Sequence, residues 1–463
     1  MSAALSPAAP AATPDPGVLQ VIGELASATA RTAPPEEVRH AARRCLVDWL
    51  GVAIAGWDEP PAARLRLALG RPEAPAGFAG AFRPGLPADH AALVLGTASH
   101  ALDYDDTDHV NLIHVSSTLF PALLALSARE RFDGAALLDV FNAAYEAEDR
   151  IGALLGRKLT ARGWHVSGVI GHLGSALACG LALELPPAGL AQAMAISATA
   201  ASGFIGAFGT MSKPLQLARG AADGLTAACL ARAGFTGAPR LLESDPGFTV
   251  PLLGEAIADW SSVGRDWGRP YAVLRNSFQP HASGVITHPT VDAAMAMADR
   301  YEAAGLEPAT IARVTCRVNP LAPKVAGHAY PATGLEGKFS VAWCCVAGLI
   351  LGHATPAAFA PAQIGRADLQ ALLRRIDVVT DPAIGEQQAQ VELLLTDGQR
   401  FKQAIAMAKG NPANPMTDGE LDRKFLLLTE SALGPGARDV LAQLRAFERI
   451  ADVGAWLRAT FNH

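Results

Sequence analysis

Several widely used binding and catalytic motifs are missing from this 463-residue chain. It has no GxGxxG or Walker loop for a nucleotide, no GxSxG around a serine nucleophile and no HExxH for zinc. Its six cysteines form no CxxC pair and mostly lie in apolar runs, which is typical of buried free thiols. The sequence therefore predicts a protein of the reducing cytoplasm without a structural zinc site.

Charge is also scarce, because charged residues make up 18% of the chain and the net charge is −6. The basic residues are scattered, so neither a nucleic-acid surface nor a polybasic membrane patch is expected. Half of the residues (50%) are apolar, which indicates a large, well-buried globular protein rather than a disordered one. Residues 1–17 are small and proline-rich without the basic start of a signal peptide, and they predict a flexible leader.

One uncharged run, Ala193–Ser212, has the length of a membrane span. It is rich in alanine, serine, glycine and threonine rather than leucine and isoleucine, and Lys213 follows it directly. We therefore expect a buried helix in a helical core instead of a membrane helix.

The remaining pattern divides the chain into three parts. Residues 18–269 show apolar positions at three- and four-residue steps, which predicts the first part of a large all-helical domain. Residues 270–408 contain alternating runs at 312–320, 375–381 and 389–406 around a helical stretch, which predicts a smaller α+β domain with an antiparallel sheet. Asp397-Gly398 is a hairpin signal within the last run. Residues 409–463 are expected to form C-terminal helices that rejoin the helical domain, starting at a capping box of Thr417 and Glu420.

The most unusual stretch is ALDYDDTDHVNLIHVSS, residues 101–117, which places four aspartates and two histidines in an apolar chain. Three hypotheses compete for it: a solvated loop, a metal site or an acid–base active site. Carboxylates and histidines are suitable metal ligands, but no HxxxH pair fixes a geometry and the DDxxD spacing of magnesium sites is missing. On a helix ending near Tyr104, Asp103 would share a face with Ser99, and Thr107, His109 and His114 would follow in a loop.

Four other stretches place polar groups in apolar surroundings, where burial is costly unless the groups are paired or used. His165 stands at a loop-to-helix junction, whereas His172 lies within the apolar helix and is more typical of a structural residue. Lys213 either extends to the surface or directs its charge into a pocket. His281 lies where the second domain begins, and the stretch GHAYPATGLEGKFS adds Tyr330 and Lys338.

Taken together, these stretches resemble the MmgE/PrpD family. The motifs are HALDYDDTDH followed by H.SS, GWH.S with GHLGSALACG, GTMSKPL, SFQPH with THPTVDAA, and TGLEGKFS, in this order over residues 20 to 440. The family includes 2-methylcitrate dehydratase, cis-aconitate decarboxylase and iminodisuccinate epimerase. The resemblance implies a homodimer, a polycarboxylate substrate and catalysis without a metal or organic cofactor.

Carried over by position, the family's pocket would hold Asp103, Thr107, His114, His165, Lys213 and His281. We expect His114, His165, Lys213 and Asp103 to be catalytic, with Asp103 orienting a histidine or lysine. The residues expected to bind substrate are Thr107, His109, His281, Asn276, Gln216, Tyr330 and Lys338. Asp105, Asp106 and Asp108 are expected to be caps, ion-pair partners or solvated neighbours.

The chain departs from the family pattern in three places. Asn276 stands near a usual lysine, Gln216 replaces a frequent histidine, and the loop from Thr107 to His114 differs in length. The loss of these cationic or acid–base groups weakens the two lyase assignments, so the sequence predicts an epimerase of the iminodisuccinate type that moves an α-proton between two carriers. A dehydratase or decarboxylase of the same family is the alternative. A metal-dependent enzyme using the aspartates and a non-catalytic helical binding protein remain as hypotheses of other classes.

Overall fold

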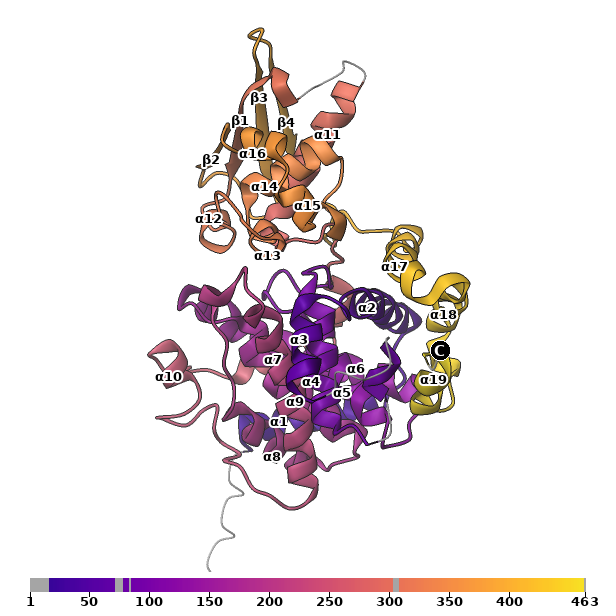
Figure 1. The fold of residues 1–463 in the computed structure, drawn as a ribbon. Helices are drawn as coiled ribbons and strands as arrows, with labels where there is room; N and C mark the ends of the chain where they lie inside the picture. The colour runs from indigo at the N-terminus through magenta and orange to yellow at the C-terminus, as the bar shows by residue number, and fades with distance from the viewer. Residues whose placement is uncertain (1–15, 71–77, 83–84, 303–307, 462–463) are drawn as a thin grey trace, which may run out of the picture.

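The computed structural model describes residues 16–70, 78–82, 85–302 and 308–461. Most of the predicted leader, residues 1–15, lies outside this part of the chain. The described residues form a large helical unit and a smaller α+β unit stacked on it (Figure 1). The chain begins in the helical unit, passes through the α+β unit and returns along the side of the first (Figure 1).

The helical unit is built from both chain ends. Its α-helices are α1 (Val18–Ala30), α2 (Glu36–Ala55), α3 (Pro60–Ala68), α4 (Ala88–Ala101), α5 (Val115–Ser127), α6 (Gly134–Ala161), α7 (Val166–Ala182), α8 (Pro187–Ala198), α9 (Ser212–Arg232), α10 (Thr249–Leu253), α17 (Asp418–Leu433), α18 (Ala437–Arg445) and α19 (Val453–Thr460). The C-terminal helix α17 packs on α2, and it starts with the predicted capping box between Thr417 and Glu420.

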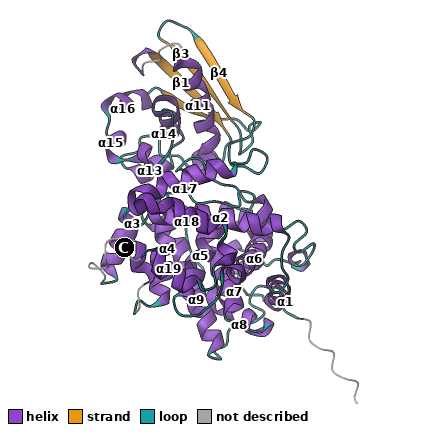
Figure 2. Ribbon diagram, turned by 90° about the vertical axis from the view of Figure 1, so that its right-hand side faces the viewer, coloured by secondary structure: helices purple, strands orange, loops and turns teal. Residues whose placement is uncertain are grey.

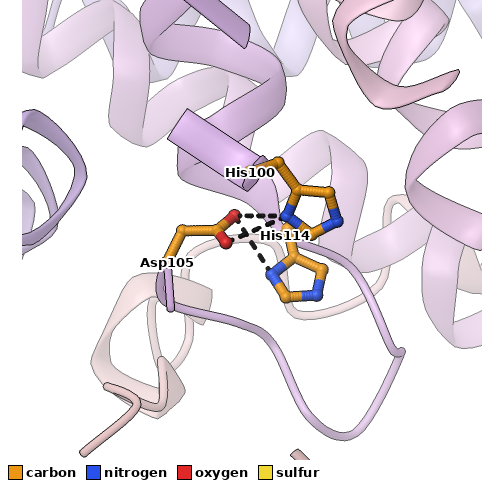
Figure 3. Close-up of side chains that lie close together, drawn as sticks. All are labelled: His100, Asp105 and His114. Carbon is orange, nitrogen blue, oxygen red and sulfur yellow. Dashed lines mark hydrogen bonds and ion pairs between the residues drawn. The ribbon is translucent and has the colours of Figure 1, made fainter. Parts of the chain in front are cut away.

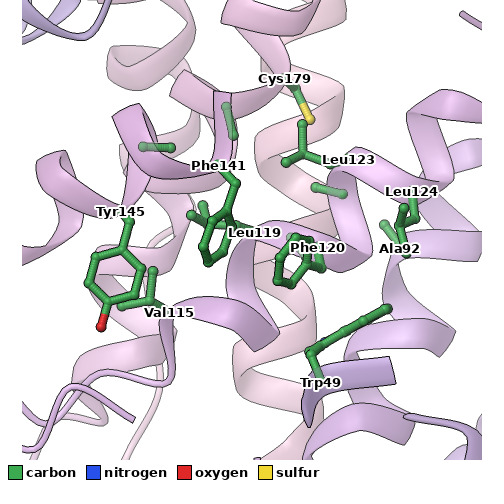
Figure 4. Packing of buried hydrophobic residues seen from close by; sticks show 14 of the residues in the cluster. Trp49, Ala92, Val115, Leu119, Phe120, Leu123, Leu124, Phe141, Tyr145 and Cys179 are labelled. Atoms are coloured by element: carbon green, nitrogen blue, oxygen red, sulfur yellow. The ribbon is translucent and has the colours of Figure 1, made fainter. Parts of the chain in front are cut away.

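Small residues allow the central helices to approach closely. A β-carbon on Gly174 of α7 would lie 1.9 Å from Oε1 of Glu148 on α6. Aromatic residues fill the wider spaces, where Phe120 and Phe141 stack with ring centroids 4.2 Å apart and Trp49 packs against Phe120 (Figure 4). This close packing gives the helical unit a rigid surface on which polar side chains can be positioned.

The smaller unit contains a four-stranded sheet in the order β2-β1-β3-β4. Its elements are α11 (His288–Glu302), β1 (Ile311–Val318), α12 (Ala322–Val325), α13 (Gly334–Lys338), α14 (Val341–Val346), α15 (Pro361–Ile364), α16 (Ala367–Leu373), β2 (Ile376–Thr380), β3 (Ala389–Leu395) and β4 (Arg400–Ile405). A π-helical turn, Ala347–Leu351, continues α14. Helices α11 and α14 contact each other and the sheet (Figure 2).

The strand pairings follow the prediction in part. β1 with β3 and β3 with β4 are antiparallel, and Asp397 and Gly398 form the predicted hairpin turn with Gly398 at φ 90°. β1 and β2 are parallel, because the chain passes between them through the helices α12 to α16. The sheet is thus mixed, with a parallel edge strand that the alternating pattern alone could not orient.

The prediction of one buried helix over Ala193–Ser212 is wrong. Helix α8 ends at Ala198, and a loop with a 3-10 turn at Ile205–Ala207 leads to α9. Gly203 and Gly209 take φ values of 131° and 82°, which a continuous helix cannot contain. None of the described helices combines the length and the apolarity that crossing a membrane requires.

Two connections join the units side by side. The backbone N–H of Phe278, where the chain leaves the helical unit, donates to the carbonyl of Gly410, where it returns, at 3.1 Å. The His109 ring contacts both connections, with Nδ1 2.8 Å from the Ser277 hydroxyl and Nε2 3.1 Å from the Asn411 amide nitrogen. The relative placement of the two units is therefore fixed beside residues of the 101–117 stretch.

Candidate active site

A cavity between the two units collects most of the polar residues that the sequence singled out. The helical unit contributes polar side chains from the α4–α5 loop and from the starts of α7 and α9, namely Asp103, Thr107, His109, His114, His165 and Lys213. The α+β unit contributes mainly apolar side chains on the opposite side. The cavity therefore has walls of different chemistry.

Asp103 lies in the cavity lining and follows the end of α4, which comes earlier than predicted. The helix ends at Ala101 rather than near Tyr104, and Asp103 takes a left-handed backbone conformation with φ 50°. Aspartate tolerates this conformation better than most residues. Its carboxylate forms an ion pair with Lys213, while its Oδ2 is buried without a hydrogen-bond partner among the described residues.

Lys213 lies at the start of α9, and its side chain is 6% exposed. Besides the ion pair with Asp103, its ammonium lies 2.7 Å from Nε2 of His100 and 5.1 Å from the centroids of the Phe208 and Phe339 rings. The ammonium is therefore held by one carboxylate, one imidazole and two aromatic faces. This geometry supports the alternative in which Lys213 directs its charge into a pocket over the one in which it extends to the surface.

A second group of side chains shares the carboxylate of Asp105 (Figure 3). Nδ1 of His100 lies 2.9 and 3.0 Å from its two oxygens, and Nδ1 of His114 lies 3.2 Å from Oδ2. Both Nδ1 atoms therefore carry a proton toward the carboxylate. Nε2 of His100 then accepts from Lys213, whereas Nε2 of His114 has no hydrogen-bond partner in the described structure and remains available to a bound molecule.

His165 approaches the cavity from the start of α7. Its Nδ1 lies 3.0 Å from Oε1 of Gln216, which fixes the ring because the amide oxygen accepts the Nδ1 proton. Gln216 is itself held by hydrogen bonds to the backbone of Phe204. The predicted substrate ligand Gln216 thus supports a histidine and is not among the residues that line the cavity.

His114 and His165 are two of the three histidines that line the cavity, and their environments shift their pKa values in opposite directions. Burial opposes the charge on His114, but the carboxylate of Asp105 outweighs burial and raises the pKa of His114. Burial, together with the charge of Lys213, holds the pKa of His165 well below its usual value. Burial likewise lowers the pKa of His100 to about 4, so this ring is neutral near neutral pH. One cavity imidazole therefore favours the charged form and the other the neutral form.

Neighbouring ammonium and imidazole groups overcome burial at two aspartates of this site. Burial alone would raise the pKa of Asp103, but Lys213 and His100 bring it below its usual value. Burial would also raise the pKa of Asp105, and His100 and His114 hold it well below its usual value. Both groups are ionised near neutral pH. Asp106 differs, because burial followed by the charge of Asp48 raises its pKa to about 7.

His100, Asp105 and His114 are also the group of described residues that could hold a metal ion, since their ligand atoms lie within 4.8 Å of one another. Two imidazoles and a carboxylate are a suitable donor set for zinc. In this structure, however, the donor atoms are hydrogen-bonded to one another, and the Lys213 ammonium lies 2.7 Å from His100. A dication would have to displace these bonds next to an existing positive charge.

Several predicted substrate-binding residues lie elsewhere. Asn276 donates to Asp106 at 2.6 Å and accepts from Tyr145 at 3.0 Å, away from the residues that line the cavity. His281 pairs with Asp292 at 2.8 Å, and Lys338 donates to the carbonyl of Leu102 behind Asp103. Tyr330 is 62% exposed and packs against Arg374. None of these four side chains is among the residues that line the cavity.

The sequence reasoning also missed residues that the structure brings to the site. His100 was not singled out. Asp105 was expected to be a cap, an ion-pair partner or a solvated neighbour, and it is an ion-pair partner that is fully buried between two histidines. The signal for His100 was its place in the HALDYDD motif, five residues before Asp105. Phe208 was not singled out either, because it lies in the run Ala193–Ser212, which was predicted to be one buried helix.

Comparison with known proteins identifies the family. A family model for the MmgE/PrpD N-terminal domain matches residues 20–260, and one for the MmgE/PrpD C-terminal domain matches residues 281–447. The chain belongs to the MmgE/PrpD family. In this MmgE/PrpD protein, the cavity lies where the parts matched by the two models meet, since its lining residues come from both.

The relatives that are similar to this chain are named as decarboxylases or as decarboxylase-like. Cis-aconitate decarboxylase of Mus musculus is 28% identical over 354 residues, which is 73% of this chain and 71% of the relative. The Homo sapiens enzyme of the same name is 28% identical over 358 residues, 73% of this chain and 72% of the relative. A cis-aconitate decarboxylase-like protein of Aspergillus oryzae is 24% identical over 428 residues, 86% and 88% of the two chains. These names agree with the lyase alternative rather than with the epimerase.

Proposed function

We propose that this chain is a cofactor-independent lyase that moves a proton at a carbon next to a carboxylate, and that it removes carbon dioxide from an unsaturated carboxylic acid. The observation that supports this proposal is that His114 and His165 both line the cavity and have pKa values shifted in opposite directions. An acid and a base in one cavity are what proton transfer to and from carbon requires. The names of the relatives favour decarboxylation among the family's reactions.

Four residues of the site would have separate roles in decarboxylation. In a decarboxylation, the bond between the carboxylate and the carbon skeleton breaks, carbon dioxide leaves, and the electron pair stays on the skeleton. Protonated His114 donates the proton that replaces the lost group. Lys213, with Asp103 behind it, stabilises the negative charge that develops before this proton arrives. Water then returns a proton to His114, and the carboxylate of Asp105 favours this step because it raises the pKa of the ring.

Loss of water is the second lyase reaction that these groups could carry out. Neutral His165 would take the α-proton, and protonated His114 would donate a proton to the departing hydroxyl group, which leaves as water. The epimerase hypothesis stays a prediction with less support. It depended on the missing charge at Asn276 and Gln216, and neither of these side chains lines the cavity.

The experiment is incubation of the purified protein in D2O with unsaturated and β-hydroxy carboxylic acids, followed by NMR. The first compounds are cis-aconitate, 2-methylcitrate and iminodisuccinate, and unsaturated dicarboxylates with an alkyl substituent follow them. We expect loss of carbon dioxide from an unsaturated acid, with deuterium at the carbon that is protonated. Interconversion of iminodisuccinate stereoisomers without loss of carbon dioxide or water would overturn the lyase proposal. The homodimer that the family resemblance implies is a separate proposal, which light scattering of the eluted protein would test.

A further inference from the structure

The two walls of the cavity differ in chemistry, and this difference bears on the substrate. The helical unit supplies the polar side chains described above, together with Leu112, Trp164 and Val166. The α+β unit contributes Val285, Ile286, Leu321, Val325 and Phe339 besides Glu386 and Gln387, and Ile205 and Phe208 of the loop before α9 extend the apolar side. Most of the apolar side chains from the α+β unit and this loop are partly exposed, as expected for side chains that face a cavity. A cavity with apolar side chains beside charged ones suits a ligand with both kinds of surface.

The positive charge of the polar wall is small and already paired. Lys213 is bound to Asp103, and His114 is bound to Asp105. No arginine is among the residues that line the cavity in the described part of the chain. Arg157, near the rim, pairs with Glu386 at 2.6 Å, and Glu386 lines the cavity as a further negative charge. The described lining therefore offers only two positively charged groups, Lys213 and His114, as contacts for one or two carboxylates.

A third carboxylate would therefore have to face either the apolar wall or Glu386. Burying an unpaired carboxylate against apolar side chains is strongly unfavourable, and placing it beside another carboxylate adds repulsion. An alkyl or aryl group at the same position would instead gain free energy from contact with Phe208, Phe339 and their neighbours. The aromatic rings that flank Lys213 mark the boundary, with the ammonium 5.1 Å from each centroid.

From this arrangement we propose that the substrate is a carboxylic acid with one or two carboxylates and an apolar arm, rather than a tricarboxylate. The carboxylates bind at Lys213 and His114, and the apolar arm lies against the α+β unit between Phe208, Leu321 and Val325. This inference rests on the proposed function for the location of the reacting groups. It goes further by naming a substrate class that differs from cis-aconitate, the tricarboxylate in the names of the relatives.

The test uses saturated ligands, which cannot react as unsaturated substrates do, so that binding is measured separately from turnover. Titration calorimetry at pH 7.5 compares tricarballylate, with three carboxylates, against methylsuccinate and butylsuccinate, with two. We expect butylsuccinate to bind at least about tenfold more tightly than tricarballylate, and methylsuccinate to lie between them. Equal or tighter binding of tricarballylate, or no binding of any of the three, would overturn the inference.

A charge placed on the apolar wall gives a sharper second measurement. Val325→Lys, or Leu321→Lys if the first variant does not fold, should strengthen tricarballylate binding and weaken butylsuccinate binding by severalfold each. The matched control is Leu427→Lys, since Leu427 is 62% exposed on α17 and away from the cavity, and it should change neither affinity. If butylsuccinate is preferred but no unsaturated acid reacts in the NMR experiment, the reaction proposal fails and the substrate class stands.

Discussion

The ammonium of Lys213 lies 2.7 Å from Nε2 of His100, which makes the imidazole an acceptor and the lysine a donor. This direction agrees with the lowered pKa of His100, which leaves the ring neutral near neutral pH. The lysine is thereby fixed at the cavity while the other nitrogen of the ring remains bonded to Asp105. Two parts of the site, one around Asp103 and one around Asp105, are thus connected through a single imidazole.

Replacing the central cation should abolish most activity. We expect Lys213→Ala to lower kcat/KM by about 10²-fold or more, because the charge that stabilises the developing anion is lost. The exposed Lys402→Ala on β4 is the control and should retain full activity. Since the single variant leaves Asp103 buried without its partner, Asp103→Asn/Lys213→Met offers a neutral version of the pair. Near-wild-type rates in the folded double variant would contradict the role of Lys213.

Asp105→Asn keeps the size of the side chain and removes its charge. Because this carboxylate raises the pKa of His114, its loss should lower that pKa. The limb of the pH–rate profile that belongs to His114 should then move to lower pH, and kcat should fall by about 10-fold or more with a smaller change in KM.

The pH at which this limb lies distinguishes an effect of Asp105 on His114 from a general loss of stability, because only the first changes the pKa of His114. Asp108→Asn is the comparison, since Asp108 bonds to Asn111 and to the backbone of its own loop rather than to a histidine. It should leave the limb in place even if the protein becomes less stable. An unshifted limb in Asp105→Asn would show that the pKa of His114 has another origin.

Metal removal should leave the activity unchanged. The donor atoms of His100, Asp105 and His114 bond to one another, and Lys213 adds a positive charge 2.7 Å from one of them. Dialysis against EDTA, with kcat measured before and after and metal content determined by elemental analysis, checks this expectation. Activity that is lost on dialysis and restored by zinc alone would instead support a metal-dependent site formed by these residues.

Stability should fall with rising pH because of a buried carboxyl group in the helical core. Burial raises the pKa of Glu148 from 4.5 to about 8, and its Oε1 accepts from Thr118 at 2.8 Å. The stabilising protonated form is fully present below pH 4.5 and is lost as the pH passes 8. From this group alone, the free energy of unfolding should fall by about 1 kcal/mol per pH unit between pH 5 and 8.

Urea unfolding of the wild type and of Glu148→Gln at four pH values between 5.5 and 8.5 measures this effect. The amide has the same shape and cannot ionise, so the variant should show a weaker dependence on pH. The exposed Glu37→Gln should follow the wild type. Parallel curves for the wild type and Glu148→Gln would mean that Glu148 has an ordinary pKa in the folded state.

Local signals in the sequence sufficed for much of the fold. The capping box at Thr417, the hairpin at Asp397-Gly398 and the change from helical to alternating patterns each depend on neighbouring residues, and the structure contains all three. The cavity residues Asp103, His114, His165 and Lys213 could also be predicted, since polar groups in apolar runs are either paired or functional.

What the sequence could not provide were relationships between distant segments. Asn276 was placed in the pocket by alignment, but its amide turns to Asp106 and Tyr145, which only the packed structure brings near it. The shared carboxylate of Asp105 depends on a left-handed turn at Asp103 that ends α4 early. The apolar wall comes from half-buried residues of another unit, and no periodicity distinguishes such residues from ordinary core positions.

The two connections between the units are bonded to each other at Phe278 and Gly410. Because the chain leaves and re-enters the helical unit at adjacent residues, the α+β unit is an insertion whose two ends meet at one place. His109 touches both connections and also lines the cavity, so a substitution that disturbs this junction would change one edge of the cavity directly.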